Sequence, residues 1–137
     1  MIVLDTDIVS ALMRADTSVV DWLDRQASSS VWTTTITVFE IQFGLAAMPQ
    51  GRRRRAAELA FADVIDDDLD GRVLSFDRSA AHDAAQLMAT RQRSGKVKEV
   101  RDTMIGGIAL SQNATLATRN VRHFDDLRVP VVNPWRV

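Results

Sequence analysis

The 137-residue chain contains no cysteine and only two histidines, and its formal net charge is −1. Without cysteine the chain can form neither a disulfide framework nor a thiolate metal site, so a reducing compartment would be harmless to it. A net charge this small gives the chain as a whole no strong attraction for nucleic acid or for membranes. Attraction for a polyanion therefore has to come from local patches of basic side chains.

Long hydrophobic runs are also missing. No apolar stretch approaches the roughly 20 residues that a membrane-spanning helix requires. The first apolar residues have no basic segment before them and are interrupted by Asp5, unlike a signal peptide. The chain shows no internal repeat, low-complexity segment or linker, and its length suits one domain. We therefore expect a soluble, cytoplasmic protein with a single domain over residues 1–137.

Short apolar or β-branched runs alternate with helical patterns along the whole chain. The expected strands cover residues 2–4, 31–36, 72–76, 115–118 and 129–134. Pro130 lacks a backbone N–H and therefore places the last strand at an edge of the sheet. Alternation of strands and helices is typical of a parallel sheet with helices on both faces. The sequence therefore predicts an α/β fold, a three-layer α/β/α domain with a mainly parallel central sheet.

The first expected strand, Ile2 to Leu4, is apolar without alternation, as in a strand that is buried on both faces. It ends at Asp5, and the carboxyl ends of parallel strands open into the crevice where ligands bind. Asp5 is therefore expected in that crevice. Asp5 and Asp7 could instead cap the helix that follows, because Asp is a preferred N-cap residue. For Asp7 we expect substitution by Asn to have little effect.

Two more acids stand where helices are expected to begin. Glu40 follows the second strand, and the Thr37-x-x-Glu40 spacing is that of a capping box, which by itself accounts for Glu40. A residue in this turn nevertheless faces the same crevice as Asp5. Asp102 begins an almost wholly apolar helix, whose Gly106–Gly107 pair predicts close packing against another backbone, expected to be a central strand. Asp102 is then expected beside Asp5, with helix capping as the alternative.

Two groups of basic residues could bind phosphates. Arg52 to Arg55 begin a helix that acidic residues end, the reverse of the arrangement that the helix dipole favours. Either solvent and salt screen this arrangement, or the segment contacts a partner, which would be a second copy of the chain or a nucleic acid. The second group leads into the helix of Asp102 and comprises Arg91, Arg93, Lys96, Lys98 and Arg101.

Four motifs, in chain order, resemble those of the PIN-domain nucleases, and the length and the C-terminal residues resemble the VapC branch of toxins from type II toxin–antitoxin pairs. The motifs are Val3-Leu4-Asp5-Thr6, Thr37-x-x-Glu40, Asp102-x-Met104-Ile105-x-x-Ile108-Ala109 and Thr118-Arg119-Asn120-x-x-x-Phe124, with Asn133-Pro134 closing the chain. Each motif alone is weak, but four in order over the whole chain make the resemblance specific.

The resemblance implies an endoribonuclease that depends on Mg²⁺ or Mn²⁺, with Asp5, Glu40 and Asp102 as its acidic cluster. It also implies a homodimer that a cognate antitoxin protein holds inactive, and RNA as the substrate. The chain departs from the family pattern at the fourth acidic position, where it has Asn120, and at His123, where many relatives have an acid. We still count Asn120 with the catalytic residues, and the departures bear on a second metal ion more than on the first.

Physical reasoning from the same residues leads to the same chemistry. Three carboxylates in one crevice need a cation, because at about 4 Å and an effective dielectric constant near 20 each pair costs on the order of 4 kcal/mol. Oxygen ligands without cysteine favour a hard ion such as Mg²⁺. We expect Asp5 and Asp102 to bind the ion directly, and Glu40 to bind it through water or to act as the base. The polar residues expected to hold these carboxylates in place are Thr6, Thr118 and Asn120.

Two other functions fit the same acids. A structure-specific DNA nuclease would use the same cluster, but it would cut flapped or nicked duplex and leave single-stranded RNA intact. A non-catalytic binding module would use the acids only as helix caps. The thermal stability of such a module would not respond to Mg²⁺ or Mn²⁺, because a ligand stabilises only a fold that binds it.

Overall fold

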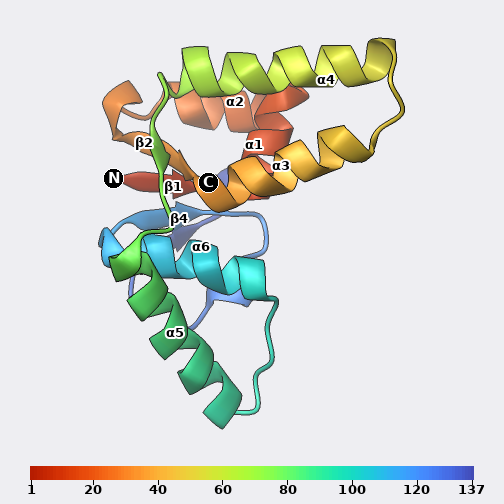
Figure 1. Ribbon diagram of the computed structural model, residues 1–137. Coiled ribbons are helices and arrows are strands. Elements are labelled where there is room, and N and C mark those ends of the chain that lie inside the picture. Colours follow the sequence, from red (N-terminus) through yellow and green to blue (C-terminus); the bar gives the residue numbers. More distant parts are fainter.

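The computed structural model describes residues 1–137 and arranges them in three layers (Figure 1). A sheet of five strands forms the middle layer. Helices α1 to α4 cover one face of this sheet, and helix α6 covers the other, with α5 packed against α6. The three-layer α/β/α fold with a parallel central sheet is therefore confirmed.

All strand pairs in the sheet are parallel, and the strand order is β3-β2-β1-β4-β5. The strands are β1 (Ile2–Leu4), β2 (Val31–Thr34), β3 (Val73–Leu74), β4 (Thr115–Ala117) and β5 (Val131–Val132). Strand β1 is central, and β5 is an edge strand, as Pro130 predicted. The chain builds outwards from β1 to β3 and then returns to the other side of β1, so the order switches between β1 and β4. Ligand sites in such sheets lie at the carboxyl ends of the strands at this switch point.

Six α-helices connect and cover the strands. They are α1 (Thr6–Met13), α2 (Thr17–Asp24), α3 (Thr35–Ala47), α4 (Arg52–Asp63), α5 (Arg78–Arg93) and α6 (Val100–Ser111). A π-helical turn at Val64–Asp68 continues α4, and 3₁₀ turns occupy Ser28–Ser30, Val121–Phe124 and Pro134–Arg136. None of the helices combines the length and the apolar character that crossing a membrane requires.

Two apolar clusters hold the layers together. One lies between the sheet and α1 to α4 and includes Ile8, Trp22 and Phe61, and the other lies under α6 and includes Ile105 and Phe124. Burial of apolar side chains on both faces of the sheet fixes the position of each strand end, because a shift of one residue would expose the core face.

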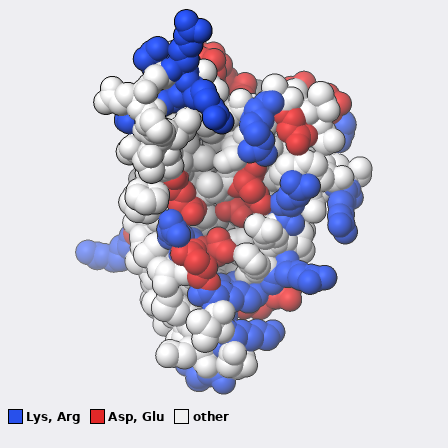
Figure 2. All heavy atoms as spheres, turned by 90° about the vertical axis from the view of Figure 1, so that its right-hand side faces the viewer, with Lys and Arg blue, Asp and Glu red and all other residues white.

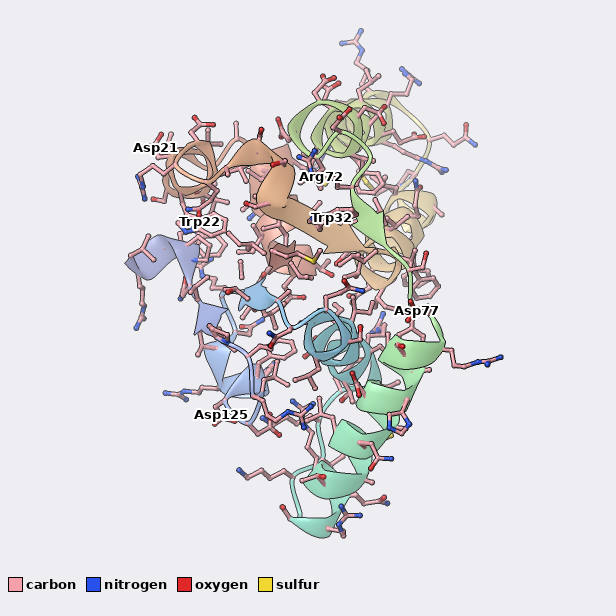
Figure 3. The ribbon with its side chains drawn as sticks, turned by 90° about the vertical axis from the view of Figure 1, so that its left-hand side faces the viewer. Asp21, Trp22, Trp32, Arg72, Asp77 and Asp125 are labelled. Carbon is pink, nitrogen blue, oxygen red and sulfur yellow. The ribbon has the colours of Figure 1, made fainter.

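Figure 3 shows the side of the sheet where the strands begin, and there packing and hydrogen bonds connect the segments before the strands. Arg72 donates a hydrogen bond of 2.8 Å from Nε to the carbonyl oxygen of Val31, which ties the segment before β3 to the start of β2. Trp22 is buried on this side, and Trp32 of β2 is half-buried. These contacts are structural. The polar residues of the predicted site gather on the opposite side, at the carboxyl ends of the strands.

Two helices begin with caps other than the predicted ones. Thr34, the last residue of β2, caps α3 by accepting a hydrogen bond of 3.1 Å from the backbone N–H of Thr37. Glu99 caps α6 by accepting a hydrogen bond of 3.1 Å from the backbone N–H of Asp102. The capping box at Thr37 and Glu40 is therefore wrong, and so is a capping role for Asp102. Neither acid uses its side chain as a helix cap.

The glycine pair of α6 does pack closely against another backbone, as predicted, but that backbone belongs to α5 and not to a central strand. A Cβ atom added at Gly107 would lie 2.6 Å from Cβ of Ala84 and 2.7 Å from the carbonyl oxygen of Ala80. The small residues of α5 and α6 face each other, while Ile105 and Ala109 of α6 face the sheet. The two helices therefore approach more closely than a side chain at Gly107 would allow.

Candidate metal centre

A polar pocket of about 350 Å³ opens at the carboxyl ends of β1 and β4. No hydrophobic residue lines it; its lining is Asp5, Thr6, Asp7, Ser10, Arg14, Glu40, Asp102 and Asn120. Figure 2 shows acidic side chains in a hollow at the centre of this face, with basic side chains around it. The structure thus brings Asp5, Glu40 and Asp102 to one pocket, although they lie far apart in the sequence.

Asp5 occupies the position directly after β1 and is only 5% exposed. Its Oδ1 accepts a hydrogen bond of 2.8 Å from the backbone N–H of Thr6, so that Asp5 is the N-cap of α1. Its Oδ2 accepts one of 2.8 Å from the hydroxyl of Thr118. Burial, followed by the charge of Asp7, raises the pKa of Asp5 from 3.8 to about 7, although both hydrogen bonds lower it. A buried carboxylate with these properties favours binding of a cation.

Thr118 connects Asp5 to the loop after β4. Its hydroxyl donates to Asp5 and accepts a hydrogen bond of 3.0 Å from the backbone N–H of Asn120. Asn120 lines the pocket. Its neutral side chain brings an amide oxygen to the pocket but no charge.

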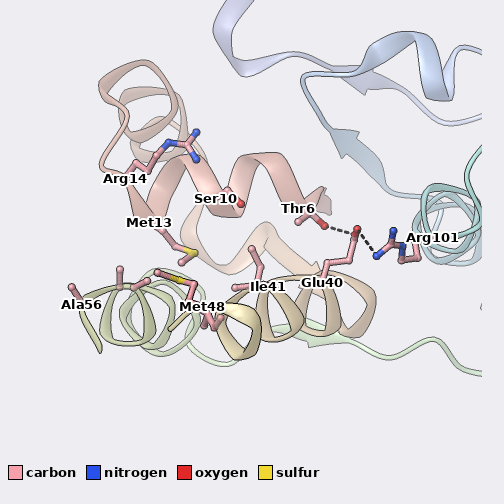
Figure 4. Close-up of a pocket in the computed structure, with 13 residues that line it drawn as sticks. Thr6, Ser10, Met13, Arg14, Glu40, Ile41, Met48, Ala56 and Arg101 are labelled. Atoms are coloured by element: carbon pink, nitrogen blue, oxygen red, sulfur yellow. Dashed lines mark hydrogen bonds and ion pairs between the residues drawn. The ribbon is translucent and has the colours of Figure 1, made fainter. Parts of the chain in front are cut away.

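Glu40 lines the pocket from the second turn of α3, and its side chain points toward Thr6 and Arg101 (Figure 4). Its Oε1 accepts a hydrogen bond of 2.8 Å from the hydroxyl of Thr6, and its Oε2 lies 3.7 Å from Nη1 of Arg101. Sequence reasoning placed Arg101 in a basic patch and missed this ion pair. Glu40 is therefore held at the rim of the pocket by one hydroxyl and one guanidinium group.

Asp102 reaches the pocket from the first turn of α6, and its Oδ2 lies 2.9 Å from Nδ1 of His123. The buried side chain of Arg91 fixes the segment that carries His123. Arg91 donates hydrogen bonds of 2.9 Å to the carbonyl oxygen of His123 and to the hydroxyl of Thr103, and it forms an ion pair of 2.8 Å with Asp126. The guanidinium of Arg91 holds the pKa of Asp126 below its ordinary value.

Arg91 is 3% exposed, so it does not belong to the surface patch in which the sequence placed it. It lies between α5, α6 and the turn of His123 instead, where its donors are used by three partners. The arginine therefore positions the side of the pocket that carries Asp102 and His123, and it is not free to bind a phosphate.

Asp7 does not cap α1, because Asp5 does. Its Oδ2 accepts a hydrogen bond of 3.0 Å from the backbone N–H of Arg119, and its Oδ1 is shielded from solvent without any hydrogen-bond partner. Burial raises the pKa of Asp7, and the charge of Asp102 adds to this effect, whereas the hydrogen bond from Arg119 opposes it. Asp7 is thus a member of the pocket that the sequence-based cap assignment missed.

The donor set of the pocket fits a hard divalent ion that keeps part of its water shell. No three acidic or histidine side chains are close enough to hold one ion together. Mg²⁺ commonly binds through one or two carboxylates and keeps several waters, so it does not require such a group. The buried oxygen of Asp7 without a donor, beside the buried carboxylate of Asp5, is the feature that calls for a cation.

An apolar groove of about 610 Å³ continues from the pocket between α1, α3 and α4 (Figure 4). Four residues line both the groove and the pocket: Thr6, Ser10, Arg14 and Glu40. The apolar residues that line the groove are Met13, Ile41, Leu45, Met48, Ala56, Ala57 and Ala60. A bound segment could therefore place a polar group in the acidic pocket and apolar side chains in the groove.

A parallel sheet that presents acids from β1, α3 and α6 to one polar pocket defines the class of the protein. The PIN domain profile matches residues 2–129, so the chain belongs to the PIN-domain family. The resemblance seen in the four sequence motifs is confirmed.

The chain is similar over almost its whole length to a ribonuclease and to a toxin. It is 39% identical to the VapC ribonuclease Y4jK of Sinorhizobium fredii, with 98% of each chain covered. It is 32% identical to the toxin FitB of Neisseria gonorrhoeae, with 98% of this chain and 99% of FitB covered. A crystal structure of FitAcB from Neisseria gonorrhoeae superposes with a TM-score of 0.83 at 30% identity and covers 100% of both chains.

Proposed function

We propose that this chain is a metal-dependent endoribonuclease, a single nuclease domain over residues 1–137 that acts in the cytoplasm as the toxin of a type II toxin–antitoxin pair. The observation that carries the proposal is the buried carboxylate of Asp5 in a wholly polar pocket that also holds Glu40 and Asp102. Similarity to a VapC ribonuclease and to a toxin, each over 98% of the chain, supports both parts of the proposal.

In this function Asp5 and Asp102 hold Mg²⁺, or Mn²⁺ as a substitute. A bound Mg²⁺ polarises the scissile phosphate of RNA and lowers the pKa of a water for in-line attack. Glu40, held by Thr6 and Arg101, orients this water or takes its proton. Thr118 fixes the carboxylate of Asp5, and Asn120 contributes a neutral oxygen at the pocket wall.

The two alternative functions differ in how the structure bears on them. A binding module whose acids are only helix caps requires Glu40 and Asp102 to be caps, and neither is. A DNA nuclease would use the same pocket, so the choice between RNA and DNA rests on the substrate test below. The names of the relatives favour RNA, since one of them is a ribonuclease.

An antitoxin with a basic side chain is the expected partner of the pocket. The acidic lining would receive that side chain, and the adjoining groove would receive the apolar residues next to it. The chain should then co-purify with a small protein encoded beside it when both are expressed from the intact operon. Purification of the chain alone under those conditions would contradict this part of the proposal.

The test of the activity is cleavage of a total RNA pool with and without Mg²⁺, with flapped duplex DNA as a parallel substrate. The wild-type protein should cut RNA only with the metal present, and Asp5→Asn and Asp102→Asn should each abolish both RNA cleavage and growth inhibition while they leave the fold intact. Full RNA cleavage by either variant in Mg²⁺ would refute the site. Cleavage of the DNA alone would show that the chain is a DNA nuclease.

A further inference from the structure

Asp7 lies in the first turn of α1, two residues after Asp5, and its two carboxylate oxygens have different surroundings. Oδ2 accepts the backbone N–H of Arg119 at 3.0 Å. Oδ1 is shielded from solvent and has no hydrogen-bond partner. A buried carboxylate oxygen without a partner is unfavourable, and in a native protein it calls for an explanation such as a bound ion.

The acids of the pocket differ in whether they have an ion-pair partner. Glu40 has Arg101 at 3.7 Å, and Asp102 has His123 at 2.9 Å. None of the ion pairs of the molecule includes Asp5 or Asp7. Asp5 and Asp7 are therefore the acids of the pocket without an ion-pair partner.

The local structure gives Asp7 no sufficient role of its own. The N-terminal end of α1 does favour an acid in its first turn through the helix dipole. Oδ1 nevertheless has no hydrogen-bond partner, and the cap position is already taken by Asp5. The bond from Arg119 uses only one of the two oxygens, and the amide oxygen of an Asn at position 7 would also accept it.

We infer that Asp7 helps to hold the divalent ion beside Asp5, with Oδ1 as its donor oxygen. The inference rests on the proposed nuclease function and adds a residue to its site. Asp7 thereby supplies, from α1, a carboxylate that the neutral Asn120 does not supply from the loop after β4. With Asp5 and Asp7 as the direct ligands, Asp102 acts on the ion through a bound water, because Mg²⁺ commonly takes one or two carboxylates and keeps several waters.

Calorimetric titration of the metal-free protein with Mn²⁺ tests the inference, because it measures binding without RNA cleavage. Asp7→Asn keeps an acceptor for Arg119 and removes the charge, and it should lower the affinity for Mn²⁺ at least tenfold. This replaces the expectation from the sequence that Asp7→Asn has little effect. Asp5→Asn should abolish binding. The matched control is Asp21→Asn, on the exposed surface of α2 away from the pocket (Figure 3), and it should bind as the wild type does.

Other results of the titration would contradict the inference. Wild-type affinity in Asp7→Asn together with loss of binding in Asp5→Asn would overturn the inference and leave Asp7 as a residue that only positions the turn of Arg119. Wild-type affinity in both variants would overturn the inference and the proposed metal site together. The melting temperature of metal-free Asp7→Asn should equal or exceed that of the wild type. A lower value would show that the charge stabilises the empty pocket, which contradicts the premise.

Discussion

At the scale of single residues, the burial of Asp5 has a direct consequence for stability. Burial, followed by the charge of Asp7, raises the pKa of Asp5 to about 7 in the folded chain, whereas the unfolded chain has the ordinary value of 3.8. Between these two values the folded state keeps a proton that the unfolded state has released. Stability of the metal-free protein therefore falls as pH rises through this window, by an amount on the order of 4 kcal/mol, since one pKa unit corresponds to about 1.36 kcal/mol.

Asp5→Asn should remove most of this pH dependence. An amide at position 5 carries no charge, and the hydroxyl of Thr118 can turn to accept a hydrogen bond from it. We expect the variant to equal the wild type at pH 4 and to be more stable by a few kcal/mol at pH 8, both without metal. Urea denaturation at the two pH values measures the difference. A variant that is less stable than the wild type at pH 8 would show that the ionised carboxylate of Asp5 does not destabilise the metal-free fold.

Residue-scale prediction from the sequence succeeded where an acid directly follows a strand or begins a helix beside the sheet. Asp5, Glu40 and Asp102 could be placed in one crevice because parallel strands end at one edge. Asp7 and Arg101 were missed because their partners, Arg119 and Glu40, lie far away in the sequence. Such contacts depend on how loops and helices meet after folding, which no local pattern encodes.

At the scale of helices and strands, the sequence located all five strands, but the caps of α3 and α6 differed from the expected ones. The run Thr33-Thr34-Thr35 offers several possible caps, and the choice depends on where β2 stops. Pairing with β3 ends at Thr34, so this residue becomes the cap and the capping box at Thr37 is not used. The position of the cap therefore depends on pairing with β3, a strand that is distant in the sequence.

Helix α5 carried a signal that could have identified Arg91 as buried. The buried residues Ala80, Ala84, Leu87 and Arg91 follow one another at helical spacing, so that Arg91 continues the apolar stripe. The composition of the basic patch concealed this periodicity. A charged residue on the inward stripe of a helix is better interpreted as a paired core residue than as part of a surface patch.

The contact between α5 and α6 predicts the effect of a small substitution. Gly107→Ala would place a methyl group 2.7 Å from the backbone oxygen of Ala80, and the two helices would have to separate. We expect a loss of about 1–3 kcal/mol in the free energy of unfolding. Gly44→Ala is the matched control, because nothing lies within 4 Å of its added Cβ and helix propensity favours alanine by up to about 1 kcal/mol. Equal stability of both variants in urea denaturation would contradict the close packing.

The four arginines at the start of α4 give a second prediction at this scale. Only Arg54 has an ion-pair partner, Glu58 at 3.4 Å, so the other three remain available for phosphates. If Arg52 to Arg55 contact RNA, changing all four to Ala in the inactive Asp5→Asn background should lower the slope of log affinity against log salt by up to about 3. The quadruple Lys variant keeps the charge and should keep the slope. An unchanged slope in the Ala variant would leave salt screening or a protein contact as the explanation.

At the scale of the whole molecule, the exposed aromatic residues of α3 form the patch that we expect a second copy to cover. Phe39 and Phe43 are 57% and 63% exposed and stack with ring centroids 6.4 Å apart. Exposed apolar patches commonly mark protein interfaces. We expect the protein to purify as a homodimer, and Phe39→Ser with Phe43→Ser to shift it to a monomer in light scattering. A dimer that survives both changes would place the interface elsewhere.

The central claim for the molecule is that the polar pocket at the ends of β1 and β4 holds the divalent ion of a nuclease. Diffraction from crystals soaked in Mn²⁺ and recorded at the Mn absorption edge tests it most directly, because the anomalous signal locates the metal itself. The account predicts a peak in the pocket within about 2.5 Å of a carboxylate oxygen of Asp5, and no such peak in Asp5→Asn crystals. A peak at another site, or none at saturating Mn²⁺, would contradict the account.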